Sequence, residues 1–380
     1  MTKLDCALTI ENVDKYYGTV RALSQINLHV KPGEFLTILG PSGSGKTTLL
    51  KCVAGFETIN GGRLLLGEAD ITDKDPGARN IGMVFQNYAL FPHMTVEQNV
   101  AFPLVMRRMG RAEIAKRVAD ALELTELGRF AKRYPRQLSG GQQQRVALSR
   151  AIVFEPSLLL LDEPFGALDR KLRETLQLEV RRLQRELNLT TLFITHDQEE
   201  ALLMSDRIAV MFDGELHQVS GPEEIYQRPA NARVANFIGE SNLLKGKLSA
   251  ARGSATTLRF VLESGISVAL AARNDAACSV DGEKVLLLRP EHLSPCIDSG
   301  CVGNQKNVLP TTVEELVYLG NVSRYRLRMQ DGTELVMRLS GSGPKLRVGD
   351  AVRVRFSEDD AVLVAAERHT LPPRVLAEVA

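Results

Sequence analysis

The chain has 380 residues and a formal net charge of +1, with 44% hydrophobic and 24% charged residues. This composition is that of an ordinary globular protein of about two or three domains, and the small net charge does not favour bulk binding to nucleic acid. No apolar run approaches the roughly 20 residues that span a bilayer, which excludes a membrane-spanning helix. The first 15 residues contain no apolar core segment and no cleavage-site pattern, so we expect no signal peptide and a cytosolic protein.

Strands and helices are predicted to alternate over residues 1 to about 237. Short apolar runs at 34–40, 157–164 and 190–195 are typical of buried parallel strands, and residues 46–55 have the pattern of a helix. Strands that are joined through helices imply a parallel sheet that is covered on both faces.

A helical insertion and an edge hairpin complete this first region. Residues 88–156 are predicted to be largely helical, and the segment 111–127 has four apolar residues on one helical face: Ile114, Val118, Ala121 and Leu122. Within 208–220, two strand-like runs flank Asp213-Gly214, a strong turn signal, so we expect a hairpin at one edge of the sheet.

After residue 244 the pattern changes to short alternating runs, at 284–288, 324–329, 333–339, 351–356 and 361–366. Asp331-Gly332 and the segment from Gly341 to Pro344 supply turns between them. Many short strands with turn signals predict a small all-β domain, an open barrel. We therefore expect two domains, 1–240 and 241–380.

The cysteines predict neither a disulfide framework nor a zinc site. None of the five forms a Cys-x-x-Cys pair, and a chain of this size without a secretion signal has little use for disulfides. His292, Cys296 and Cys301 are close in sequence, but their spacing fits no zinc pattern and a fourth ligand is missing. The five cysteines are Cys6, Cys52, Cys278, Cys296 and Cys301, and for His292, Cys296 and Cys301 we expect ordinary burial or a place in a loop.

The segment 40–48, "GPSGSGKTT", matches the phosphate-loop pattern and lies between a predicted strand and a predicted helix. Its backbone N–H groups can turn toward phosphate oxygens, and the helix N-terminus adds a favourable dipole. Lys46 can neutralise the β- and γ-phosphates, and the Thr47 hydroxyl can bind Mg²⁺. The predicted phosphate-binding residues are Gly40, Pro41, Ser42, Gly43, Ser44, Gly45, Lys46, Thr47 and Thr48.

Three polar residues at strand ends are predicted to lie at the same edge as this loop, because parallel strands deliver their C-terminal residues there. Asp162 ends the 157–164 strand and can hold Mg²⁺. Glu163 follows it and can orient or deprotonate an attacking water. His196 follows the 190–195 strand and is expected to contact the γ-phosphate.

A second anion-binding helix start is predicted at 138–142, "LSGGQ". Ser139 can cap a helix, and the paired glycines leave the backbone N–H groups accessible. A capping box between Ser139 and Gln142 accounts for these two residues but not for Gly140 and Gly141.

Together these stretches resemble the ATP-binding cassette family of transport ATPases over about 240 residues. The order is the family's: "KYYG" before the phosphate loop, "GMVFQ", "LSGGQ", "LLLLDEP", "ALD" (167–169) and a histidine after the last strand. The resemblance implies an α/β P-loop core with helical and antiparallel β subdomains, and hydrolysis of MgATP between two copies of the chain.

The resemblance also implies roles for single residues. Tyr17 would stack on adenine, and Gln86 would contact Mg²⁺ or water and report the nucleotide state. Asp169 would communicate across the dimer. Ser139, Gly140, Gly141 and Gln142 would grip the γ-phosphate bound by the partner copy. The apolar segment 85–104 would receive a short helix of a membrane subunit through Tyr88, Leu90, Phe91 and Pro92, although a buried core also explains it.

The segments 223–244 and 287–293 and the β-rich tail resemble bacterial importer ATPases with an appended oligomer-binding-type (TOBE) domain, most closely those for spermidine and putrescine. Ferric-iron, sugar and glycerol-phosphate importers share this architecture. The implied partners are a second copy, two transmembrane permease subunits and an extracytoplasmic solute-binding protein, at the cytoplasmic face of the membrane.

Two other functions stay open at this point. A soluble cassette ATPase in DNA repair or translation would usually carry a coiled coil or two cassettes, and this sequence has neither. The β-rich tail could also bind nucleic acid by stacking, since aromatic and basic residues alternate at Tyr318, Arg324, Tyr325, Arg326 and Arg328. We expect that tail to serve dimer contacts or regulation instead, with no nucleic-acid partner.

Overall fold

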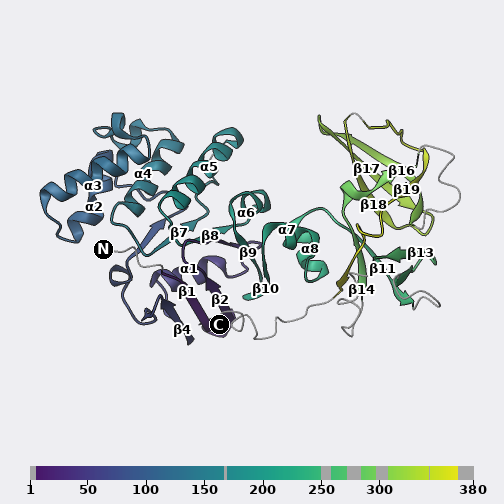
Figure 1. Cartoon of the computed structure of the whole chain (residues 1–380), viewed down its shortest axis with the longest axis horizontal. Coiled ribbons are helices and arrows are strands. Elements are labelled where there is room, and N and C mark those ends of the chain that lie inside the picture. Colours follow the sequence, from purple (N-terminus) through teal and green to yellow (C-terminus); the bar gives the residue numbers. More distant parts are fainter. Residues whose placement is uncertain are drawn as a thin grey trace. The chain divides into compact units, whose positions relative to one another are not determined.

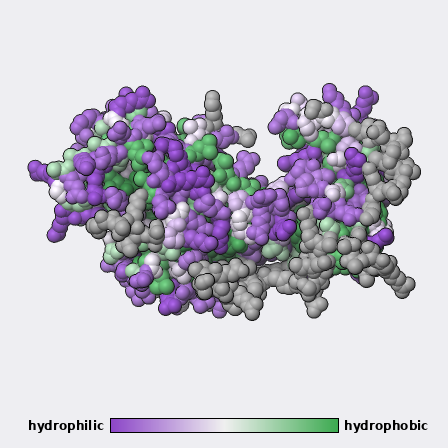
Figure 2. All heavy atoms as spheres, viewed as in Figure 1, coloured by the Kyte–Doolittle hydropathy of each residue, from purple (hydrophilic) through white to green (hydrophobic). Residues whose placement is uncertain are grey.

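The computed structural model describes residues 6–166, 169–249, 258–271, 284–296, 307–341 and 343–366. The chain divides between Pro222 and Glu223 into two compact units, which are described separately (Figure 1). Five residues named above lie outside the described ranges: Ala167, Leu168, Cys278, Cys301 and Ser342. Hydrophilic side chains cover much of the face of both units that Figure 2 shows, and no described helix has the length and apolarity needed to cross a membrane.

A six-stranded sheet forms the centre of the first unit, in the order β10-β9-β3-β8-β7-β6. Its strands are β3 (Phe35–Leu39), β6 (Ile81–Val84), β7 (Leu158–Asp162), β8 (Thr191–Thr195), β9 (Arg207–Phe212) and β10 (Glu215–Ser220). All pairs are parallel except β9 with β10. The predicted edge hairpin is confirmed, and its turn residues Asp213 and Gly214 both have positive φ, 49° and 78°.

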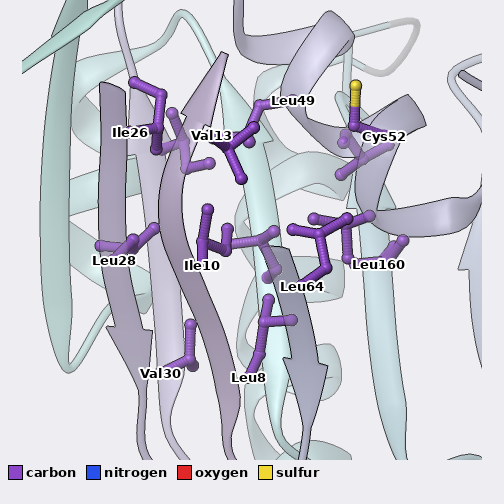
Figure 3. Packing of buried hydrophobic residues seen from close by; sticks show 14 of the residues in the cluster. Leu8, Ile10, Val13, Ile26, Leu28, Val30, Leu49, Cys52, Leu64 and Leu160 are labelled. Atoms are coloured by element: carbon purple, nitrogen blue, oxygen red, sulfur yellow. The ribbon is translucent and has the colours of Figure 1, made fainter. Parts of the chain in front are cut away.

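One face of this sheet packs on α1 (Lys46–Ala54) and on a second, antiparallel sheet. That sheet has the order β2-β1-β4-β5. Its strands are β1 (Leu8–Tyr17), β2 (Val20–Val30), β4 (Gly61–Leu66) and β5 (Ala69–Asp70). Figure 3 shows apolar side chains of β1, β2 and β4 pointing toward those of α1 and β7. This buried cluster fixes α1, and with it the phosphate loop, against the sheet.

The opposite face of the central sheet is covered by helices α4 (Gly140–Ile152), α5 (Arg170–Glu186) and α6 (Gln198–Met204). Successive residues of β7 and β8 point to opposite faces, as the period of a strand requires. Leu160 packs toward α1, whereas Leu159 and Leu161 pack toward these helices.

Helices α2 (Val96–Met106) and α3 (Arg111–Leu124) form a layer with α4 around a cluster of their own. Val118, Ala121 and Leu122 are buried in it and Ile114 packs against it, so the predicted apolar face of this helix is confirmed. Three short 3₁₀ turns connect the elements of this unit: η1 (Pro76–Ala78), η2 (Gly128–Phe130) and η3 (Pro135–Gln137).

The second unit contains two five-stranded antiparallel sheets, β13-β12-β11-β14-β20 and β15-β19-β16-β17-β18. The first sheet comprises β11 (Asn242–Ser249), β12 (Leu258–Leu262), β13 (Ser267–Leu270), β14 (Lys284–Leu288) and β20 (Val362–Ala365). The second comprises β15 (Ser294–Pro295), β16 (Val308–Tyr318), β17 (Val322–Met329), β18 (Glu334–Ser340) and β19 (Ala351–Arg355). One buried cluster joins both sheets, as expected for the predicted β domain.

Helices α7 (Pro222–Gln227) and α8 (Ala232–Ile238) precede these strands, and η5 (Pro290–His292) follows β14. Arg289 binds this helical segment: its Nη1 donates to Ala235 O at 3.1 Å and to Ser241 Oγ at 2.7 Å, and its Nη2 donates to Tyr226 O at 2.6 Å. The helices thus pack with the β-rich part, although the sequence predicts the domain boundary near residue 240.

The alternating aromatic and basic residues of β17 are engaged within the unit. Each arginine forms an ion pair with glutamates: Arg324 with Glu240, Arg326 with Glu315, and Arg328 with Glu314 and Glu334. Tyr325 is 2% exposed and belongs to the core, so it is not available to stack on a base. The idea of a nucleic-acid-stacking strand is wrong for this residue, because the strand alternates between core and solvent.

The cysteine expectations concern three described residues. Cys6 and Cys52 are free thiols, Cys52 is buried in the core of the first unit, and Cys296 is half-buried. Burial raises the pKa of the Cys52 thiol to about 11. His292 lies 3.6 Å from Asp360 Oδ1, and no group of metal-binding side chains is found among the described residues.

Candidate active site

The phosphate loop connects the end of β3 to the first residue of α1. Gly43 and Gly45 have positive φ, 80° and 102°, which other residues rarely adopt. A Cβ on Gly45 would lie 2.7 Å from Ala22 O, and one on Gly40 would lie 2.2 Å from Met211 O. The loop therefore needs glycine at these positions for space as well as for conformation.

The loop has the donors that a phosphate group requires. Gly45 is the N-cap of α1 and makes no side-chain cap, so the N–H groups of the first turn have no capping side chain. Ser44 Oγ is buried without a hydrogen-bond partner among the described residues. An orphaned hydroxyl beside a helix N-terminus fits a bound anion.

Lys46 is buried and is held by the loop itself. Its Nζ donates to Gly40 O at 2.8 Å and to Pro41 O at 2.9 Å. Burial lowers the pKa of Lys46, while the charges of Glu163 and Asp162 oppose that shift. The ammonium group is thus placed over the loop and faces the acidic pair at the end of β7.

Three strands deliver polar residues to this edge, as predicted. Glu163 follows β7, His196 follows β8, and Gln86 follows β6 by two residues. His196 Nδ1 lies 3.1 Å from Glu163 Oε1, and Gln86 Nε2 donates to Glu163 Oε2 at 3.4 Å. Glu163 is therefore the common partner of both residues.

The backbone at Glu163 is strained. Its φ is 44°, a conformation that costs about 1–3 kcal/mol for a residue other than glycine. Its N–H donates to Ile194 O of β8 at 3.1 Å, which helps to hold the peptide in place.

Asp162 lies beside Glu163 but differs in environment. Its carboxyl is partly buried, and this burial, together with the charge of Glu163, raises its pKa. Lys51 and Lys46 act in the opposite sense. A desolvated carboxylate next to a second carboxylate is a favourable ligand for a divalent cation. Asp162 and the exposed Thr47 of α1 therefore fit the predicted Mg²⁺ site in chemistry.

Tyr17 lies at the end of β1 and is 45% exposed. Lys15 Nζ lies 4.9 Å from the centre of its ring and 3.1 Å from Glu57 Oε2, so the ring is supported on one side. An exposed, supported aromatic ring is suited to stacking on a planar base.

The "LSGGQ" segment begins α4, in the layer with α2 and α3 and away from α1 (Figure 1). Ser139 and Gln142 form the capping box: Gln142 N donates to Ser139 Oγ at 3.4 Å, and Ser139 N donates to Gln142 Oε1 at 3.0 Å. Ser139 and Gly140 are exposed. A Cβ on Gly141 would lie 3.1–3.3 Å from the side chains of Leu172 and Leu176, so that glycine permits close packing on α5.

Asp169 is the N-cap of α5, where its Oδ1 accepts a hydrogen bond from Leu172 N at 3.0 Å. Its side chain is exposed. The local role is that of a helix cap.

Sequence reasoning missed Arg150, which lies in the last turn of α4. Its guanidinium donates to the carbonyl oxygens of Tyr88 and Ala89, both at 2.8 Å. These residues are about 60 positions away along the chain, and no local pattern marks such a contact. Tyr88 itself is buried among the residues under the central sheet, whereas Pro92 is exposed.

The fold and the loop define a P-loop nucleotide-binding protein. Comparison with known proteins then gives the family. The family model "ABC transporter" matches residues 23–166, and the model "TOBE domain" matches residues 286–364.

Curated relatives match almost the whole chain. The spermidine/putrescine import ATP-binding protein of Pseudomonas aeruginosa is 45% identical over 365 residues, covering 93% of this chain and 96% of that protein. The Fe(3+) ions import ATP-binding protein of Fusobacterium nucleatum is 43% identical over 328 residues, covering 86% and 85%.

Among solved structures, an ATP-binding cassette determined as a dimer in a post-hydrolysis state with ADP and Pi is similar. It has a TM-score of 0.51 and 36% identity and covers 57% of this chain and 98% of that chain. The chain belongs to the ABC transporter family of import ATP-binding proteins and is an ABC-type transport ATPase with a C-terminal TOBE domain. The predicted fold class, a P-loop α/β core with helical and antiparallel β subdomains, is confirmed.

Proposed function

We propose that this protein hydrolyses MgATP at two sites in a homodimer, each made from the phosphate loop of one copy and the Ser139 helix start of the other. The observation that carries this proposal is the split arrangement of the anion-binding elements. Lys46, Glu163 and the strand ends lie at one edge of the central sheet, while the start of α4 packs with α2 and α3. Each copy contributes half of two enclosures.

The residues of the phosphate edge would act as follows. Gly40–Thr48 hold the phosphate oxygens of ATP through backbone N–H groups, and Lys46 moves its Nζ from the loop carbonyls to the β- and γ-phosphates. Tyr17 stacks on the adenine. Glu163 Oε1 or Oε2 accepts a proton from the attacking water, and His196 orients that carboxylate and contacts the γ-phosphate.

A bound Mg²⁺ would neutralise charge on the β- and γ-phosphates, with Thr47, Gln86 and Asp162 as the residues that hold it. Gln86 then shares its amide between the metal site and Glu163, to which it donates at 3.4 Å. This double contact makes Gln86 sensitive to whether the γ-phosphate is present.

The partner copy would supply Ser139, Gly140, Gly141 and Gln142, whose exposed helix start meets the γ-phosphate. ATP bound between two copies favours the closed dimer by its affinity for that state. Asp169, at the start of α5, would report across the interface. After hydrolysis the phosphate bridge is lost and the dimer opens.

We propose that a permease subunit docks on the helical layer. A groove of about 920 Å³ lies between α2 and α3, and its apolar lining includes Ala101, Val105, Ile114 and Val118. The exposed Pro92 and the partly buried Leu90 and Phe91 precede these helices. A short amphipathic helix fits such a groove, because its apolar face covers the lining.

The solute is proposed to be a polyamine, spermidine or putrescine, because relatives with that assignment match over more than nine-tenths of the chain. Ferric iron is the alternative, supported by the relative named for that ion. The complex would include two transmembrane permease subunits and an extracytoplasmic solute-binding protein, with this ATPase at the cytoplasmic face of the membrane.

Reconstitution of the complex in lipid vesicles tests both levels of the proposal. ATP hydrolysis should rise several-fold when the solute-binding protein carries spermidine, and labelled spermidine should enter the vesicles only with ATP. Stimulation by ferric ion alone would move the assignment to iron, and hydrolysis without any import would remove the transport role.

The boundary between the ATPase domain and the C-terminal domain is also a proposal. The sequence favours an ATPase domain of 1–240, whereas the compact units divide after Pro222. Chains ending at residue 222 and at residue 240 can be compared for ATP binding and solubility. Since α8 packs on β14 in the second unit, the shorter chain leaves no orphaned helix.

A further inference from the structure

The loop that follows Gln86 has an unusual backbone. Tyr88 and Ala89 both have φ in the left-handed region, 60° and 45°, although neither is glycine. A single residue of this kind is uncommon, and two in succession persist only when surrounding contacts hold them. Tyr88 is buried under the central sheet, while Ala89 is exposed.

Arg150 supplies the holding contacts. Its Nη2 donates to Tyr88 O and its Nη1 donates to Ala89 O, each at 2.8 Å, and its guanidinium lies 5.6 Å from the centre of the Phe91 ring. The planar fork of arginine can bind two successive carbonyls at once, which the single ammonium of lysine does less well.

The far end of the loop is held by another residue. Asn99 of α2 accepts a hydrogen bond from Phe91 N at 2.9 Å and donates to Phe91 O and Met94 O, both at 3.1 Å. The loop is therefore tied to α2 beyond Phe91 and to α4 before it. Arg150 is the contact through which α4 reaches the left-handed residues.

The position of Arg150 along α4 allows this contact to transmit a movement of the helix. Ser139 caps the start of the helix and Arg150 lies in its last turn, about 17 Å away at 1.5 Å per residue. The helix contains no proline between them. A displacement of the Ser139 end is therefore carried to the Arg150 end as a rigid movement.

We propose that Arg150 is a positioning residue that couples α4, the helix that begins at the "LSGGQ" segment, to the Tyr88–Phe91 loop. When the dimer closes on ATP, the γ-phosphate pulls on the start of α4, and Arg150 passes that movement to the loop that leads into α2 and its docking groove. This inference rests on the proposed function, in which the Ser139 end contacts the partner's ATP and the permease docks on the helical layer that follows the loop.

The test compares four variants of the full chain: Arg150→Met, Arg150→Lys, Ala89→Gly, and the double variant Arg150→Met with Ala89→Gly. Glycine adopts the left-handed region without penalty, so Ala89→Gly should compensate for the lost contact. Arg145→Met is the matched control, because Arg145 lies on the same helix and pairs with Glu179 at 2.7 Å.

The first measurement is hydrogen–deuterium exchange of residues 87–93 in the isolated chain. We expect faster exchange in Arg150→Met, an intermediate rate in Arg150→Lys, a return toward the wild-type rate in the double variant, and no change in Arg145→Met. Unchanged exchange in Arg150→Met, or no rescue by Ala89→Gly, would overturn the positioning role.

The second measurement is ATP hydrolysis by the complex with permease and solute-binding protein. Arg150→Met should keep the KM for ATP within about twofold, while the stimulation by loaded binding protein falls about fivefold or more, as for a loss of coupling energy. Full stimulation of Arg150→Met despite faster loop exchange would overturn the coupling. If the wild-type complex itself were not stimulated, the proposed function would fail, while the exchange result would still decide the positioning role.

Discussion

Two helix starts in the first unit are suited to an anion, and their surroundings differ sharply. Near the start of α1 lie the buried Lys46, the adjacent carboxylates Asp162 and Glu163, and His196, which contacts Glu163. At the start of α4, the side chains of Ser139 and Gln142 hydrogen-bond only to each other's backbone within the described part of the chain. The start of α1 has groups nearby that can take part in hydrolysis, whereas the start of α4 can only bind an anion.

This difference explains why one chain would need a second copy. Hydrolysis requires a base, a cation and stabilisation of the transferring phosphoryl group on all sides. In the proposed function, the edge at Lys46 and Glu163 would supply the base and hold the cation, which leaves one side of the γ-phosphate to be covered. A helix N-terminus from another copy can cover that side and exclude water.

The largest expected effect comes from replacing Glu163, the proposed general base. Glu163→Gln should lower the ATPase rate by about 10²-fold or more, the usual contribution of a positioned general base, while ATP still binds. The closed dimer should then accumulate with ATP, visible as a dimer peak in size-exclusion chromatography. Glu199→Gln, an exposed glutamate of α6, is the control. Rapid turnover by Glu163→Gln would remove this residue from the catalytic role.

The next largest effect tests whether the phosphate loop of one copy and the Ser139 helix start of the other form one site. Lys46→Ala should inactivate the phosphate loop, and Ser139→Asp should place a carboxylate against the partner's γ-phosphate. Each variant alone should be nearly inactive, but an equal mixture should regain about a quarter of the wild-type rate, since half of randomly formed dimers have one intact site. A mixture as inactive as its components would contradict the shared enclosure.

A smaller effect separates helix capping from anion binding at Ser139. Ser139→Ala should cost about 1 kcal/mol of stability through loss of the N-cap, lowering Tm by about 2–4 °C. Ser139→Asp should keep Tm near the wild-type value, because aspartate is an equally good cap. Thermal melts of both variants without nucleotide make the comparison. If Ser139→Ala and Ser139→Asp lost activity to the same extent and also lowered Tm by the same amount, Ser139 would be only a structural cap.

Much of the phosphate edge could be predicted from the sequence because its determinants are local. The glycines, Lys46 and the strand before them are adjacent in the chain, and parallel strands necessarily bring Asp162 and His196 to the same edge. The contacts of Glu163 with Gln86 and His196 agree with this expectation.

What the sequence did not predict depends on contacts between distant segments. The burial of Tyr88 follows from packing under the sheet, and the hold of Arg150 on its carbonyl joins segments with no shared pattern. The left-handed φ of Glu163 also could not be predicted from the sequence, because an Asp-Glu-Pro segment is typical of an ordinary turn. The packing of α8 on β14 also depends on the buried Arg289.

The smallest expected effect concerns the acidic pair of the phosphate edge. Burial and the neighbouring Glu163 raise the pKa of Asp162, so its ionised form is less favourable in the folded chain than in the unfolded one. The group therefore contributes stability below the unfolded pKa of about 4, and that contribution is lost as pH rises through the raised folded value. The charged form of Lys46 is likewise disfavoured in the folded chain, because burial lowers its pKa.

Asp162→Asn should accordingly raise the Tm of the nucleotide-free protein at pH 7 by roughly 1–2 °C, and this gain should shrink as pH falls toward 4. The same variant should lose the stabilisation that Mg²⁺ with ATP gives to the wild type. Melting curves from pH 4 to pH 8 measure both, with the exposed Asp120→Asn as control. A lower Tm for Asp162→Asn at pH 7 would mean that attraction to Lys46 and Lys51 outweighs desolvation. The ionised Asp162 would then not destabilise the nucleotide-free protein.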